Sequence, residues 1–166
     1  MKHIFNTFAL LAAALACLSL TACSKDDDSP KSELEGTWMI SNIGSYDEYI
    51  DRYSDEYSFV QFKNGKYTEM YVGVGLDAYR AIKEAEYEIF RADYTVNQDV
   101  VTLSRVIKSE GNLNHRDDWG EVDDPKFDYN IQYEIVHGKL KWGGELYSKA
   151  SESDMQKYID MFSIKL

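Results

Sequence analysis

Residues 57–72 read YSFVQFKNGKYTEMYV, and this stretch predicts the fold more firmly than any other. Its centre, at residues 64–65, is an Asn-Gly pair. This is the strongest short signal for a β-hairpin, because both residues tolerate a positive φ. A two-residue loop fixes the register and sorts the side chains onto two opposite faces. One face has no lysine and more aromatic residues than the other, so we expect it to point into the core. It carries Ser58, Val60 opposite Glu69, Phe62 opposite Tyr67, and Tyr71.

Further strands are predicted along the chain. Residues 87–103 form two strands that turn at residues 97–99. Residues 127–135, FDYNIQYEI, alternate between apolar and polar side chains without a fault. A His-Gly pair at residues 137–138 turns this strand back on itself. The resulting cross-strand pairs are Tyr133 with Trp142 and Ile135 with Leu140.

A helix is predicted between the first two strands, from Ser45 to Glu56. Aromatic and apolar residues recur there at three- and four-residue spacing, which is typical of one helix face. Ser45 followed by Glu48 fits a capping box. The recurring residues are Tyr46, Tyr49, Ile50, Tyr53 and Tyr57.

The C-terminal part contains a second predicted helix. Residues 153–156 cap it, and residues 162–166 then alternate into a last strand that closes the sheet. Residues 106–125 lack any periodicity, and their acids do not match the spacing of a calcium-binding loop, so we interpret them as a solvated loop. The buried side of the helix carries Met155, Tyr158, Ile159 and Phe162.

Together these patterns predict the fold class. Short strands, hairpin turns and half-polar alternation favour an antiparallel all-β domain. The most consistent architecture is an up-and-down β-barrel with one or two short helices. A β-sandwich is the alternative.

The start of this domain carries a family resemblance. Residues 34–40 read LEGTWMI, and Gly36-Thr37-Trp38 at the start of a β domain resembles the Gly-x-Trp signature of lipocalins and of bacterial lipocalin-like lipoproteins. The resemblance implies a lipocalin-like barrel over residues 34–166. It also implies that a basic side chain from the end of the barrel packs on Trp38. The closing region offers Lys157 and Lys165 for this role.

Residues 1–22 have the pattern of a signal peptide. The apolar run at residues 8–20 is too short to span a membrane. Leu20-Thr21-Ala22-Cys23 resembles the lipobox of bacterial lipoproteins. The resemblance implies cleavage before Cys23, diacylglycerol on its thiol and acylation of its amine. Two or three acyl chains suffice for a stable membrane anchor. The alternative is an ordinary secretory signal with an unmodified cysteine.

An acidic run follows the cysteine directly. It resembles the export tag of Bacteroidetes-type surface lipoproteins, which implies a location on the outer membrane, facing the cell exterior. The alternative is a plain solvated linker. In both cases residues 23–33 are expected to form a flexible tether. The residues of the tag are Lys25, Asp26, Asp27 and Asp28.

Charge and cysteine content exclude several classes of function. The formal charge is −11 at pH 7. Removal of residues 1–22 takes away Lys2 and no acid, so −11 becomes −12. An acidic domain of this kind is a poor candidate for binding nucleic acid through a basic field. Cys17 leaves with the signal and Cys23 is lipidated, so no thiol remains for a disulfide, a nucleophile or a metal.

Catalytic and cofactor motifs are not recognisable. The mature chain has neither a Gly-x-Ser-x-Gly elbow nor a His-Glu-x-x-His pair. Residues 73–78, GVGLDA, have the spacing of a dinucleotide fingerprint. The strand before them is half polar, however, whereas a Rossmann strand is apolar. We interpret them as a glycine-rich connection followed by one or two helical turns. We therefore expect no enzyme, no cofactor and no metal.

Glu69 is the one acid on the predicted inward face of the first hairpin. An unpaired buried carboxylate costs several kcal/mol or becomes protonated. A basic partner, water in an open lumen or a ligand donor must therefore offset it. We hypothesise a ligand pocket with Glu69 as its polar anchor and the tyrosine helix as its lid. The alternative is that Glu69 sits at the barrel rim in water and the aromatic residues are core. The remaining pocket residues are Tyr67, Tyr133 and Trp142 in the wall and Tyr46, Tyr49 and Tyr53 in the lid.

Two functions remain open at this stage. In the first, the barrel of a membrane-anchored lipoprotein holds a small apolar or sugar-like ligand. In the second, the barrel is solid and docks a protein partner of the envelope or the cell exterior. Barrels of about eight strands can be hollow or filled. The state of the lumen therefore distinguishes the two functions.

Overall fold

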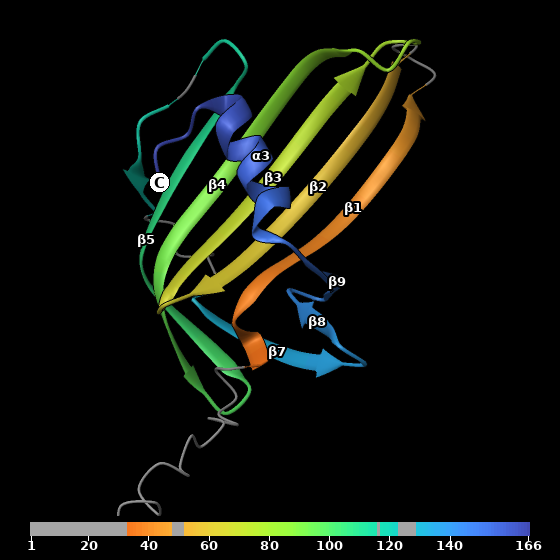
Figure 1. Cartoon of the computed structure of the whole chain (residues 1–166). Helices are drawn as coiled ribbons and strands as arrows, with labels where there is room; N and C mark the ends of the chain where they lie inside the picture. Colours follow the sequence, from red (N-terminus) through yellow and green to blue (C-terminus); the bar gives the residue numbers. More distant parts are fainter. Residues whose placement is uncertain (1–32, 48–51, 116, 123–128) are drawn as a thin grey trace, which may run out of the picture.

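The computed structural model describes residues 33–47, 52–115, 117–122 and 129–166. Within them, nine strands and the helix α3 follow one another along the chain (Figure 1). The predicted signal peptide, Cys23, the export tag and Tyr49 lie outside the described residues. The elements are β1 (Gly36–Asp47), β2 (Arg52–Lys63), β3 (Lys66–Leu76), β4 (Ile82–Asn97), β5 (Val100–Asn112), β6 (Gly120–Glu121), β7 (Asn130–Val136), β8 (Lys139–Trp142), β9 (Glu145–Ala150) and α3 (Glu152–Phe162).

Eight of the strands close into an antiparallel barrel. Neighbouring strands follow the order β4-β3-β2-β1-β9-β8-β7-β5, and β5 pairs with β4 to complete the ring. The two-residue β6 adds to β5 at Ile107 and Lys108. Apart from β6, each strand lies beside its neighbours in sequence. The predicted all-β, up-and-down barrel is confirmed.

The ring is closed by β9, not by the C-terminal tail. β9 pairs with β1 from Thr37 to Met39, whereas residues 164–166 form no strand. Phe162 is the last residue of α3, and Ser163 ends the helix in the left-handed conformation, with φ at 52°. The predicted closing strand is therefore wrong. In β9 only Tyr147 is fully buried, so alternation is faint in this strand.

The predicted hairpin registers are confirmed. Phe62 lies opposite Tyr67 across the Asn-Gly turn, and both turn residues have a positive φ. Tyr133 lies opposite Trp142 across the His-Gly turn. The register of both hairpins follows from the turn, because a two-residue loop leaves one way to pair the strands.

The helix predicted from Ser45 to Glu56 is wrong. β1 continues to Asp47, and β2 begins at Arg52. Two of the tyrosines that suggested a helix face are instead cross-strand neighbours. Tyr46 pairs with Tyr53, and their ring centroids are 5.2 Å apart. Pairing with a neighbouring strand overrides a short helical pattern, because helix propensity is only a weak prior.

The long strands bury both of their faces. The inner face of the sheet forms a barrel core around Phe62 and Tyr67. The outer face forms a second core beneath α3, which lies across β3 and β4 (Figure 1). The hairpin face that was predicted to point outward is therefore buried under the helix, where Phe59, Met70 and Val72 are fully covered. The four predicted helix residues, Met155, Tyr158, Ile159 and Phe162, are buried there as expected.

A basic side chain does pack on Trp38, but it comes from β9. The Nζ atom of Lys149 lies 3.9 Å from the centroid of the Trp38 ring. Lys157 lies over Tyr158 instead, at 5.1 Å. The assignment of Lys157 or Lys165 to Trp38 is therefore wrong. It followed from the missed strand β9.

The barrel is filled at one end and open at the other. β9 pairs with β1 only as far as Met39, and β7 pairs with β5 only from Val100 to Thr102. The far ends of β1 to β5 therefore project beyond the short strands β7 to β9 (Figure 1). β5 continues to Asn112, so the first part of the predicted loop 106–125 is a strand instead. No helix in the described part of the chain is long and apolar enough to cross a membrane.

Candidate functional site

The aromatic residues of the predicted pocket wall lie in the barrel core. Tyr67, Tyr133 and Trp142 all belong to the inner cluster. The rings of Tyr67 and Trp142 have centroids 5.6 Å apart, and Phe62 touches both, at 5.5 and 5.2 Å. These distances are typical of packed aromatic pairs. Side chains therefore fill this part of the lumen.

Glu69 lies at the boundary between this core and the open end. It is partly buried, opposite Val60 and Phe90. The Tyr67 hydroxyl donates a hydrogen bond to its carboxylate. Burial raises the pKa of Glu69, the bond from Tyr67 offsets part of that rise, and the nearby Glu88 adds to it. The compensating donor was missed, although Tyr67 stands two residues earlier on the same strand face, where alternation places it beside Glu69.

Tyr46 and Tyr53, the two tyrosines of the predicted lid that the structure describes, lie on β1 and β2 at the open end. Tyr46 is 50 % exposed. Tyr53 borders the cavity described below, and the Arg80 guanidinium lies 5.8 Å from its ring centroid. The structure thus brings Tyr46 and Tyr53 together but keeps them apart from the buried pair Tyr133 and Trp142. The predicted site residues therefore do not form a single pocket.

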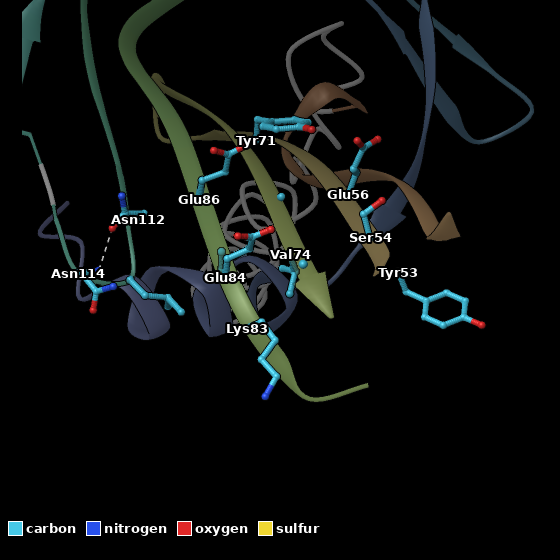
Figure 2. Close-up of a pocket in the computed structure, with 14 residues that line it drawn as sticks. Tyr53, Ser54, Glu56, Tyr71, Val74, Lys83, Glu84, Glu86, Asn112 and Asn114 are labelled. Carbon is cyan, nitrogen blue, oxygen red and sulfur yellow. Dashed lines mark hydrogen bonds between the residues drawn. The ribbon is translucent and has the colours of Figure 1, made fainter. Parts of the chain in front are cut away.

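A cavity of about 650 Å³ lies at the open end instead (Figure 2). Strands β2, β3 and β4 and the end of β5 supply its lining. Figure 2 shows Glu84 and Glu86 on β4, with Glu56 across β3 on β2. Sequence reasoning missed this site. Its signal was the row of acids at alternate positions 84, 86 and 88, which marks one polar strand face.

Two glycines make room for the carboxylates on the floor of this cavity. Gly73 and Gly75 lie inside β3, not in a connection as predicted. A Cβ atom at Gly75 would stand 2.6 Å from Cγ of Glu84, and one at Gly73 would stand 3.4 Å from Cγ of Glu86. Glycine in a strand interior often marks a close approach of another group. Here the approaching groups are the two glutamate side chains.

The charge of the cavity is predominantly negative. Among the described residues that line it, Glu56, Glu84 and Glu86 are acidic and Lys83 alone is basic. The Lys83 ammonium is paired with Asp77, 3.1 Å away. Burial, followed by the charge and hydrogen bond of Glu56, raises the pKa of the Tyr71 hydroxyl in the cavity wall.

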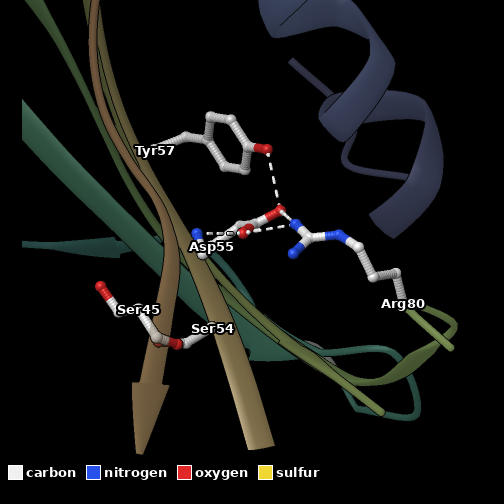
Figure 3. A network of polar contacts seen from close by, with 6 residues as sticks. Ser45, Ser54, Asp55, Tyr57 and Arg80 are labelled. Atoms are coloured by element: carbon white, nitrogen blue, oxygen red, sulfur yellow. Dashed lines mark hydrogen bonds and ion pairs between the residues drawn. The ribbon is translucent and has the colours of Figure 1, made fainter. Parts of the chain in front are cut away.

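An ion pair between the buried Asp55 and the half-exposed Arg80 joins the strand ends beside the cavity (Figure 3). Asp55 is 8 % exposed and accepts two hydrogen bonds from Nη2 of Arg80, at 3.0 and 3.1 Å. It also accepts one from the Gly44 amide, at 2.8 Å. These bonds join β2 to the β3–β4 turn and to the bulge in β1. The open end is thus built from fixed strands.

Within the described residues, no group of three or more histidine, cysteine, aspartate and glutamate side chains is arranged to hold a metal ion. No protein-family profile matches the chain, and no curated protein matches it at a significant level. A proposal about function must therefore be based on the geometry of the open end.

Proposed function

We propose that this chain is a lipid-anchored protein of the cell envelope that docks a partner at the open end of a solid barrel. The observation that carries the proposal is the contrast between the two ends. Aromatic rings around Phe62 pack the barrel, whereas a cavity of about 650 Å³ occupies the inner face of β2 to β4 at the open end. A filled lumen favours docking over storage of an apolar ligand inside the barrel.

The direction of β1 supports an outward-facing open end. β1 starts at Gly36, opposite Phe62 at the filled end, and runs to Asp47 at the open end. Its 12 residues span about 40 Å at roughly 3.3 Å per residue. A tether from Cys23 joins the domain at the filled end. The open end then points away from the membrane.

A small polar ligand, such as a sugar-like molecule, is the second candidate. The volume of the cavity lies within the range of small-molecule sites, roughly 300–1,000 Å³. The side chains of Asn112 and Asn114 add amide groups to the lining. In this case the ligand site is the open end, not the lumen.

Replacement of Cys23 tests the anchor. The Cys23→Ala variant should leave the membrane fraction and appear in the soluble fraction, because no acyl chain can then be attached. Mass spectrometry of the mature wild-type protein should show acyl groups on Cys23. An unmodified thiol at Cys23 would reject the anchor.

Site-specific cross-linking in intact cells tests the docking end. A photoreactive phenylalanine analogue replaces Tyr79, which is 93 % exposed on the β3–β4 turn. The matched control carries the same analogue in place of Lys139, which is exposed on β8. We expect a discrete protein adduct from position 79 and none from position 139. Equal adducts at both positions, or none at either, would contradict docking through the open end.

A further inference from the structure

In the described part of the chain, no element covers the inner sheet face at the open end. α3 packs on the outer face, and β7 and β9 pair only near the filled end. Two large side chains of the cavity wall are exposed: Tyr71 at 41 % and Leu113 at 43 %. This open-end face is an unpartnered surface with both aromatic and charged groups.

The open-end face crosses four strands. Tyr53 on β2, Tyr71 on β3, Glu84 on β4 and Asn112 on β5 all line the cavity. Neighbouring strands are about 4.8 Å apart, so four strands span roughly 14 Å. An extended chain covers that distance with about four residues, at roughly 3.3 Å each. An extended segment of about four residues therefore fits across this face.

Charge gives the chemistry of that segment. Among the described residues that line the face, Glu56, Glu84 and Glu86 are acidic and Lys83 is the one base; the Lys83 ammonium is paired with Asp77. Glu84 lies so close over Gly75 that a Cβ atom there would crowd it, and Glu86 lies over Gly73 at van der Waals distance. A ligand on this floor therefore meets carboxylate oxygens first. Complementary charge requires ammonium or guanidinium groups on the ligand.

Apolar surface continues beyond the cavity. Tyr79 is 93 % exposed on the β3–β4 turn, and Ile82 is 51 % exposed at the start of β4. A free amine bound in the cavity would leave both side chains in water. Side chains at alternate positions of an extended chain point to opposite faces. A peptide whose basic residues are followed along the chain by apolar residues would therefore cover them. Interfaces of this kind draw their affinity from aromatic anchors and their specificity from charge.

We propose that the open-end face binds an extended, basic and apolar segment of a partner protein. This inference rests on the proposed docking function and names the partner's chemistry. Lysine or arginine side chains of the segment reach Glu56, Glu84 and Glu86. The rings of Tyr71 and Tyr79 cover its apolar side chains and its cationic groups.

Fluorescence anisotropy with defined peptides tests the inference on the full-length lipoprotein in a neutral detergent. The probe is a labelled eight-residue peptide of four arginines followed by four leucines, and the comparison peptide carries glutamine in place of arginine. Wild-type protein should bind the first peptide and not the second. The combined variant Glu56→Gln, Glu84→Gln, Glu86→Gln should bind the arginine peptide about tenfold more weakly, because exposed charge pairs contribute modestly and cumulatively.

The matched control changes the net charge equally, with Glu121→Gln, Glu134→Gln and Glu145→Gln at exposed positions elsewhere. It should bind within twofold of wild type. If the combined open-end variant does not fold, as judged by its melting curve, Glu56→Gln alone serves and should show a partial loss. Equal loss in the control would overturn the inference, because binding would then follow net charge alone.

Two further results would also overturn the inference. If free spermine binds as tightly as the arginine peptide or more tightly, the site binds a small amine and not a peptide segment. If the arginine peptide does not bind, the open-end face does not recognise a basic segment. These failures are separable from failure of docking. If position 79 gives a cross-link but the peptide does not bind, the proposed docking function is still supported. If position 79 gives no specific cross-link, the proposed docking function itself is contradicted.

Discussion

At the scale of single residues, Gly36 shows how the start of the barrel is built. Its φ of +124° is a conformation that side-chain-bearing residues rarely adopt. The Lys149 ammonium donates a hydrogen bond to the Glu35 carbonyl at 2.7 Å and lies over the Trp38 ring. A Cβ atom on Gly36 would stand 2.6 Å from Nζ of Lys149. Glycine is thus required at position 36 for two reasons: the positive φ of the backbone and the close approach of the Lys149 side chain from β9.

Gly36→Ala should destabilise the fold by roughly 1–3 kcal/mol, since it adds backbone strain and displaces Lys149. Thermal and urea unfolding measure the loss. Gly120→Ala is the matched control, because a Cβ atom there meets nothing within 4 Å and φ is not positive. It should change the stability by less than about 0.5 kcal/mol. An equally stable Gly36→Ala variant would show that the lysine stack tolerates a side chain.

Ionisation of Glu69 makes the stability of the fold depend on pH. Its pKa is raised above the ordinary value of 4.5, mainly by burial. The folded state therefore binds a proton more readily than the unfolded state. As pH rises from about 4.5 through the raised folded pKa, the carboxylate ionises in the folded protein and the wild type loses stability. Below this window the group is protonated in both states and contributes no pH dependence.

Glu69→Gln should remove this loss, because glutamine keeps the acceptor for the Tyr67 hydroxyl but carries no charge. We expect the variant to match the melting temperature of wild type near pH 4 and to equal or exceed it at pH 7.5. Scanning calorimetry at both values measures the difference. The exposed Glu121→Gln should leave both melting temperatures unchanged. A variant that melts below wild type at pH 7.5 would contradict a burial-raised pKa.

At the scale of elements, α3 converts an outward sheet face into a second core. The ring of Phe162 lies 4.8 Å from that of Tyr87 on β4, and Tyr158 lies 5.7 Å from Phe59 on β2. The helix follows β9 directly, so the strand that closes the barrel also positions the helix over β3 and β4 (Figure 1). The β-sheet and helix therefore depend on each other.

Phe162→Ala should cost about 3–5 kcal/mol, because it leaves a cavity between the last turn of α3 and the sheet. Chemical denaturation measures the loss, and an increase in dye binding to exposed apolar surface accompanies it. Gln156→Ala on the exposed side of the same helix should change the stability by less than about 0.5 kcal/mol. Similar small effects of both variants would mean that α3 is not required for the second core.

The sequence predicted those elements whose signals are local. The Asn-Gly and His-Gly turns fix their own registers, and the spacing of Met155, Tyr158 and Phe162 marks a helix face without reference to the rest of the fold. The tyrosines from Tyr46 to Tyr57 fit a helix equally well by spacing, and only pairing of β1 with β2 decides otherwise. The acids at positions 84, 86 and 88 mark a polar strand face, but the open-end cavity also requires that β7 and β9 pair only near the filled end, and no local pattern shows where those pairings stop.

At the scale of the whole molecule, the two ends of the barrel have different roles. The filled end holds the aromatic core, the Trp38–Lys149 stack and the junction with the preceding chain. The open end holds the acidic cavity, fixed in place by the Asp55–Arg80 pair. A molecule with formal charge −11 approaches basic partners favourably over long range. Under the proposed docking function, the acidic cavity determines where such a partner is bound.

The predicted location of the whole protein can be tested in cells through the export tag. If Lys25, Asp26, Asp27 and Asp28 direct the lipoprotein to the cell exterior, their replacement by alanine should retain it inside the envelope. The change lies outside the folded domain, so lipidation at Cys23 and the melting temperature should both stay as in wild type. Protease added to intact cells should then digest the wild-type protein and spare the variant.

Two controls make the result interpretable. Alanine replacement of Ser24, Ser29 and Ser32 changes the same tether without touching the acids, and this variant should remain accessible to protease. Permeabilised cells should lose all three proteins equally, because the folded domain is the same in each. Protection of the wild-type protein in intact cells would reject surface display. The proposed partner would then have to lie within the envelope, because the open end is about 40 Å from the start of β1, where the proposed tether joins the domain.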